Sequence, residues 1–95
     1  MARIIIADDN QVSRLLLKKL LEVFDHELVF GENGRAAVAA FSRQPADLVL
    51  LDVNMPEMDG IAACQEIRRL PGGGNVPILM ISAMDDEAEI ERALN

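Results

Sequence analysis

Leu-Val-Leu-Leu-Asp (48–52) is the stretch of sequence that decides the fold. Its four successive apolar residues are typical of a parallel strand that is buried on both faces of its sheet. The run stops at the acidic Asp52, and a loop over residues 53–60 follows it. Similar short apolar runs occupy residues 4–7, 28–30 and 77–81. The sequence therefore predicts four strands.

Amphipathic helical patterns separate these strands. The first pattern follows Asn10, which is a suitable helix cap. Its apolar positions recur with helical spacing: Val12, Leu15, Leu16, Leu20 and Val23. Further helices are predicted over residues 37–41 and 61–70, and a last one is expected to open at Asp85 or Asp86. Because crossovers between parallel strands are right-handed, this alternation predicts an α/β fold with a parallel sheet and helices on both faces.

Composition sets the broad class of the protein. The 95 residues are enough for a single domain, and a hydrophobic fraction of 51% is ample for a packed core. The formal charge of −7 provides no basic face for direct binding to nucleic acid. No apolar run approaches the roughly 20 residues that span a bilayer. A single cysteine, Cys64, fits a reducing compartment. We therefore expect a cytoplasmic protein that binds neither nucleic acid nor membranes directly.

Polar residues follow three of the predicted strands. Asp8 and Asp9 follow the first strand, Asp52 ends the third and Ser82 follows the fourth. In open parallel sheets, ligands bind outside the carboxyl ends of the strands. Three carboxylates meeting there would repel one another unless a cation neutralised them. Oxygen ligands favour a hard ion, and Mg²⁺ suits a site with few carboxylates.

The residues also suggest individual roles at such a site. Asp9 and Asp52 are the expected direct ligands, together with the backbone carbonyl of Asn54, while Asp8 is expected to act through water or hydrogen bonds. A neutralised Asp52 carboxylate could serve as a nucleophile towards phosphorus. Each aspartate taken alone could instead be a helix cap or turn residue. The coincidence of all these positions at one edge favours a metal-dependent phosphate site.

Three blocks of this sequence resemble receiver domains of two-component response regulators. They are Ile-Ile-Ala-Asp-Asp-Asn (5–10), Leu-Leu-Asp-Val-Asn-Met-Pro-Glu-Met-Asp-Gly (50–60) and Pro-Ile-Leu-Met-Ile-Ser-Ala (77–83). They occur in the family's order and spacing, and the likeness covers essentially the whole chain. Asp-Asp-Asn and Ile-Arg-Arg-Leu-Pro (67–71) are also similar to receivers attached to hybrid sensor kinases, although stand-alone regulators share both features.

The resemblance implies a flavodoxin-like doubly wound sheet with strand order 2-1-3-4. It implies that Asp52 accepts a phosphoryl group from a histidine kinase or phosphotransfer protein, with Mg²⁺ held by Asp8, Asp9, Asp52 and the Asn54 carbonyl. By motif position, Ser82 would be the switch hydroxyl, and Ala83 the small neighbour whose backbone N–H faces the phosphoryl group. The protein would be a signalling domain rather than an enzyme, and an output domain could follow in a longer parent.

The sequence departs from the family pattern at its carboxyl end. Receivers continue through a fifth strand and fifth helix, whereas residues 1–95 are expected to form a single receiver domain without them. The family's essential lysine and aromatic switch residue lie in the missing part. Strand 78–81 would become an apolar sheet edge, which invites pairing with another chain. We therefore expect either a homodimer through residues 78–81 or a fragment of a longer protein.

Two other functions compete with phosphorylation at Asp52. A phosphatase of the haloacid-dehalogenase kind also uses an aspartate after an apolar strand, but it needs a second aspartate at the position of Asn54. A pseudo-receiver would bind partners without phosphorylation. Asp8, Asp9 and Asp52 argue against the pseudo-receiver, while the missing lysine keeps it open.

Overall fold

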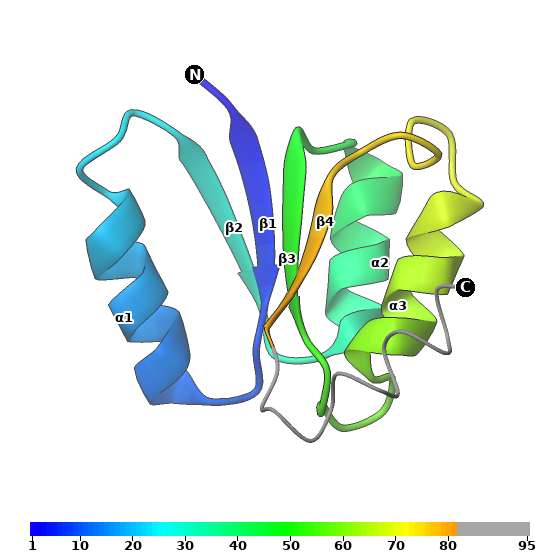
Figure 1. Ribbon diagram of the computed structural model, residues 1–95, viewed down its shortest axis with the longest axis horizontal. Helices are drawn as coiled ribbons and strands as arrows, with labels where there is room; N and C mark the ends of the chain where they lie inside the picture. Colours follow the sequence, from blue (N-terminus) through cyan, green and yellow to red (C-terminus); the bar gives the residue numbers. More distant parts are fainter. Residues whose placement is uncertain (82–95) are drawn as a thin grey trace.

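A computed structural model describes residues 1–81 of the chain. Its centre is a parallel sheet with the strand order β2-β1-β3-β4, which confirms the predicted fold class (Figure 1). The strands are β1 (Arg3–Ala7), β2 (Glu27–Gly31), β3 (Leu48–Asp52) and β4 (Ile78–Ile81). All three strand pairs are parallel, so the carboxyl ends of the strands share one edge of the sheet.

Three helices connect the strands: α1 (Gln11–Leu21), α2 (Gly34–Arg43) and α3 (Gly60–Arg68). Each begins directly after a residue whose side-chain oxygen accepts backbone N–H groups of the first turn; these caps are Asn10, Asn33 and Asp59. All three caps lie at the carboxyl edge of the sheet, where the helices start. The expected helix from Asp85 or Asp86 lies outside the described residues.

Helices α2 and α3 cover one face of the sheet, and the main core lies beneath them (Figure 1). Ile5, Val49 and Leu51 point into this core from the strands, and Phe41 enters it from α2. Cys64 is buried in the same core, as its position on the apolar side of the third helical pattern predicts. Met55 is also buried there, so the loop after β3 packs against the core.

Helix α1 lies on the opposite face and corrects one expectation from the sequence. The residues Val12, Leu15, Leu16, Leu20 and Val23 are between 56% and 77% exposed. Leu17 and Leu21 instead pack against the sheet, beside Ile4 and Ile6. The helix carries leucines around most of its circumference, so helical spacing alone could not identify the buried side.

Strand β4 is an edge strand within residues 1–81, because β3 is its only neighbour there. Leu79 in this strand is 57% exposed. The predicted apolar edge is therefore present in the described part of the chain. None of the helices formed by residues 1–81 is long and apolar enough to cross a membrane.

Candidate functional site

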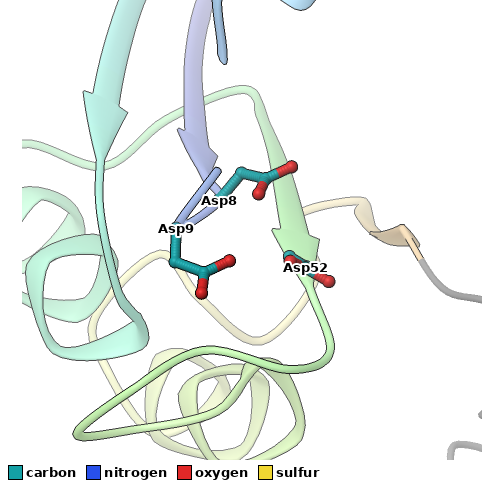
Figure 2. Close-up of side chains that lie close together, drawn as sticks. All are labelled: Asp8, Asp9 and Asp52. Carbon is teal, nitrogen blue, oxygen red and sulfur yellow. The ribbon is translucent and has the colours of Figure 1, made fainter. Parts of the chain in front are cut away.

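The register of the central strands brings three aspartates together. Ala7 of β1 lies beside Leu51 of β3, so the residues that follow them come out at the same edge. Asp8, Asp9 and Asp52 each contribute a carboxylate oxygen to a group in which all the oxygens lie within 4.8 Å of one another. Figure 2 shows the three side chains around one small space at the ends of β1 and β3. The sequence predicted this cluster.

Asp8 is the most firmly held member of the cluster. It is only 3% exposed, and its backbone N–H donates to the Gly31 carbonyl at 3.1 Å. Its Oδ1 accepts the Asn10 N–H at 2.9 Å, and its carbonyl accepts an Arg14 guanidinium N–H at 2.6 Å. These bonds fix the backbone and one carboxylate oxygen of Asp8. The neighbouring Asp9 is exposed.

Asp52 is half-buried, and its environment disfavours its charged form. Burial is the main cause that raises the pKa of this carboxyl, and the negative charge of Asp8 adds to it. The backbone N–H of Asn54 donates to Asp52 Oδ1 at 3.3 Å and works in the opposite direction. Asp52 therefore combines partial access to solvent with electrostatic repulsion from its neighbours.

The loop after Asp52 folds back closely on the strand. The Gly60 N–H donates to the Val53 carbonyl at 2.9 Å. A Cβ atom on Gly60 would collide with the Asp52 carbonyl oxygen, so only glycine allows α3 to start this close to the phosphoacceptor candidate. Val53 is tied in turn to β4, because its N–H donates to the Ile81 carbonyl at 3.2 Å.

The donor set fits a hard divalent cation such as Mg²⁺. Its side-chain donors are all carboxylate oxygens, which this class of ion prefers. None of the ion pairs formed within residues 1–81 involves Asp8, Asp9 or Asp52, so their charge is not neutralised by the basic side chains of that part. Asn54 is exposed in the loop directly after Asp52. Ser82 and Ala83 lie outside the described residues.

Arg14 is a residue of this site that the sequence did not identify. It does not belong to the apolar positions that define the first helical pattern. Its guanidinium reaches back to the carbonyl of Asp8 and lies 3.7 Å from Glu32. One feature of the sequence could have pointed to Arg14, because it lies near the start of a helix that begins directly after the acidic pair. Spacing alone does not show that an arginine folds back towards its own N-terminus.

Comparison with known proteins identifies the family. The family model for the response regulator receiver domain matches residues 4–95. A probable transcriptional regulator ycf27 of Galdieria sulphuraria is 38% identical over 84 residues, covering 88% of this chain and 32% of the relative. The signal transduction histidine-protein kinase BarA of Escherichia coli K12 is 34% identical over 87 residues, covering 92% of this chain and 10% of the kinase. The chain thus spans a third or less of these two relatives.

A solved structure shares the fold at higher coverage. The receiver domain of sensor histidine kinase PA1611 from Pseudomonas aeruginosa PAO1 has a TM-score of 0.89 and 28% identity, over 97% of this chain and 78% of that one. That structure has a magnesium ion coordinated in its active-site cleft. A receiver domain of a histidine kinase from Syntrophus aciditrophicus has a TM-score of 0.87 and 32% identity, over all of this chain and 72% of that one.

Proposed function

The chain belongs to the response regulator receiver domain family of two-component signalling, and from this we propose that Asp52 is its phosphoacceptor. The observation that supports the proposal most directly is the cluster of Asp8, Asp9 and Asp52, whose carboxylate oxygens lie within 4.8 Å of one another. Such a cluster is costly without a cation and becomes useful with one. The phosphoryl donor would be a phosphohistidine of a histidine kinase or of a phosphotransfer protein.

The transfer would use the half-exposed carboxylate of Asp52 as the nucleophile. One of its oxygens forms a bond to phosphorus while the bond between phosphorus and the imidazole nitrogen of the donor breaks. The products are an aspartyl phosphate and a neutral histidine once the imidazole has its proton. In the metal-free protein, burial and the charge of Asp8 raise the pKa of Asp52, and a bound cation would offset this unfavourable effect on the charged carboxylate.

Asp8, Asp9, Asp52 and the backbone carbonyl of Asn54 would hold Mg²⁺. When bound, the ion supplies the positive charge that lets an anionic phosphoryl group approach three carboxylates. Asp8 has a supporting part, because its hydrogen bonds to Asn10, Arg14 and Gly31 orient the acidic pair. Ser82 and Ala83 remain the proposed contacts for the phosphoryl oxygens.

The wider role follows from the family and remains a proposal. We expect a cytoplasmic signalling domain whose only chemistry is its own phosphorylation and dephosphorylation. An output or kinase domain in a longer parent is consistent with the two relatives, a probable transcriptional regulator and a histidine kinase. Because relatives of both kinds match, assignment to the hybrid-kinase type stays a prediction.

Intact-protein mass spectrometry tests the proposal. The protein is incubated with Mg²⁺ and acetyl phosphate, and a mass gain of one phosphoryl group is expected. The gain should disappear in Asp52→Ala and persist in Asp25→Ala, which removes an exposed carboxylate from a distant turn. Mg²⁺ binding without a mass gain would support the pseudo-receiver instead. Steady hydrolysis of small phosphate esters would support the phosphatase.

A further inference from the structure

The start of α2, at its cap Asn33 and its first residue Gly34, contacts the loop between β3 and α3. Asn33 Nδ2 donates to Glu57 Oε2 at 2.7 Å, and the Gly34 N–H donates to the Met58 carbonyl at 2.8 Å. The backbone of Gly34 also packs against the loop and leaves no room for a side chain. A Cβ atom there would collide with the Met58 carbonyl oxygen and would lie 2.9 Å from the carbonyl oxygen of Asp59. The start of α2 therefore supports residues 57–59 from one side.

The Asn33 side chain is itself fixed at both ends. Its Oδ1 accepts the Ala36 N–H at 2.8 Å and so caps α2. With the oxygen facing the helix, the amide nitrogen faces the carboxylate of Glu57. A hydrogen bond to a charged acceptor is stronger than one between neutral groups. Asn33 therefore links the start of α2 to the loop through one rigid amide.

Glu57 needs such support because its backbone is in the left-handed region, with φ of 64°. A residue with a Cβ atom rarely adopts this conformation, and it persists where surrounding contacts hold it. The side chain of Glu57 is held by Asn33, and the next residue, Met58, is held by Gly34. The loop conformation thus rests on one bond within the loop, from the Met58 N–H to the Pro56 carbonyl at 2.6 Å, together with the contacts that Asn33 and Gly34 make from outside.

The same loop carries the backbone of the candidate metal site. It begins directly after Asp52 and contains Asn54, whose N–H donates to Asp52 Oδ1. Its far end is tied back to the site by the bond from the Gly60 N–H to the Val53 carbonyl. Between these two anchors the chain runs from the Asn54 carbonyl through the buried Met55 to residues 57–59, so a shift at residues 57–59 would be transmitted along this short segment to the Asn54 carbonyl.

We propose that Asn33 and Gly34 are positioning residues for the phosphoacceptor site. They hold the loop so that the Asn54 carbonyl stays in place beside the acidic cluster. The role for metal binding rests on the proposed function, whereas the role in holding the loop does not. Neither residue contacts the three aspartates in any interaction that the structure gives, so the effect is transmitted through the loop.

The first test compares the same substitution at two glycines. Gly34→Ala places a methyl group against the Met58 carbonyl, whereas Gly74→Ala places it where no atom lies within 4 Å. By isothermal titration calorimetry, we expect Gly34→Ala to weaken Mg²⁺ binding roughly tenfold, the scale seen when groups that orient metal ligands are lost. Gly74→Ala should bind as the wild type does. Equal Mg²⁺ affinity in a folded Gly34→Ala protein would overturn the proposal.

The second test removes one hydrogen bond and spares the fold. Asn33→Ser keeps an oxygen that can cap α2, but it loses the amide nitrogen that donates to Glu57. Its melting temperature should change little while Mg²⁺ binding weakens. Glu57→Ala should give a similar loss, and the double variant should lose no more than either single one. Glu57→Gln keeps an acceptor for Asn33 and should stay close to the wild type. Additive losses, or no rescue by glutamine, would contradict the role of this bond.

A third measurement separates this inference from the proposed function. Without Mg²⁺, the amide hydrogens of residues 57–60 should exchange faster in Asn33→Ser than in the wild type, while those of β1 and β3 should not. Unchanged exchange in the loop would overturn the inference even if Asp52 is phosphorylated. Faster loop exchange in a protein that neither binds Mg²⁺ nor gains phosphate would support the holding role and refute the proposed function.

Discussion

The two faces of the sheet differ in how completely residues 1–81 cover them. Among the described residues, the face beneath α2 and α3 is a closed core of thirteen buried residues, whereas only Ile4, Ile6 and Leu50 are buried on the face beneath α1. Leu79 lies on that second face, because it is paired with Leu50, and it is largely exposed. One face therefore supplies most of the packing energy, and the other presents apolar surface.

The candidate site at the carboxyl edge of the sheet is supported mainly by the core beneath α2 and α3. Asp52 ends the strand that carries Val49 and Leu51 into that core, and the loop after it is anchored there by the buried Met55. Helix α1 contributes through its first turns, where Asn10 and Arg14 bind Asp8. The difference shows that the site can be well supported while much of the α1 face stays open within the described residues.

The largest predicted effect tests the closed face. Phe41→Ala removes a side chain that is 0% exposed and should lower the free energy of unfolding by about 3–5 kcal/mol. Leu20→Ala on the exposed side of α1 is the control, and its effect should be within about 0.5 kcal/mol. Urea denaturation followed by circular dichroism measures both. Similar losses for the two variants would show that the faces are equally packed in solution.

A smaller effect is expected on the open face. The exposed apolar edge at β4 predicts self-association. Leu79→Lys should weaken that association about tenfold, equivalent to about 1.4 kcal/mol, because a charge at an edge strand opposes pairing. Gln65→Lys, which adds the same charge on exposed α3, should not. Sedimentation velocity over a range of protein concentrations measures the effect. A wild-type protein that stays monomeric throughout would refute the prediction.

The smallest predicted effect concerns Asp52, at the carboxyl edge of the sheet. In the folded protein the pKa of Asp52 is raised, so its ionisation opposes folding. That loss of stability is absent below the unfolded pKa near 3.8 and grows as pH rises through the folded pKa. Without Mg²⁺, Asp52→Asn should therefore be more stable than the wild type at neutral pH, by about 0.2–1 kcal/mol after allowance for solvent screening.

Thermal melts from pH 3 to pH 8 provide the check on Asp52. The advantage of Asp52→Asn should shrink as the pH falls, and added Mg²⁺ should reduce it at neutral pH by stabilising the wild type. An advantage that is the same at every pH would mean that ionisation of Asp52 is not its cause.

The sequence was sufficient for the strands and for the acidic cluster. The apolar runs end in Asp8 and Asp52, and parallel register places such ends together, so proximity followed from strand order. The orientation of α1 did not follow, because leucines on several sides of the helix give equally good apolar faces. The contacts of Arg14, Asn33 and Glu57 did not follow either, because they join segments through side-chain rotamers and one left-handed residue.

The order in which the strands are made has a consequence for synthesis. Ile5 of β1 pairs with Val29 on one side and with Val49 on the other, so the first of these four strands to leave the ribosome becomes an interior strand of the sheet. During translation β1 can pair with β2 early, but its second edge stays open until β3 has emerged. Contacts between such distant residues form slowly and leave apolar edges exposed meanwhile. The nascent chain should therefore be most prone to aggregation and most dependent on chaperones before residue 52 has left the ribosome, and should become protected once β3 has docked.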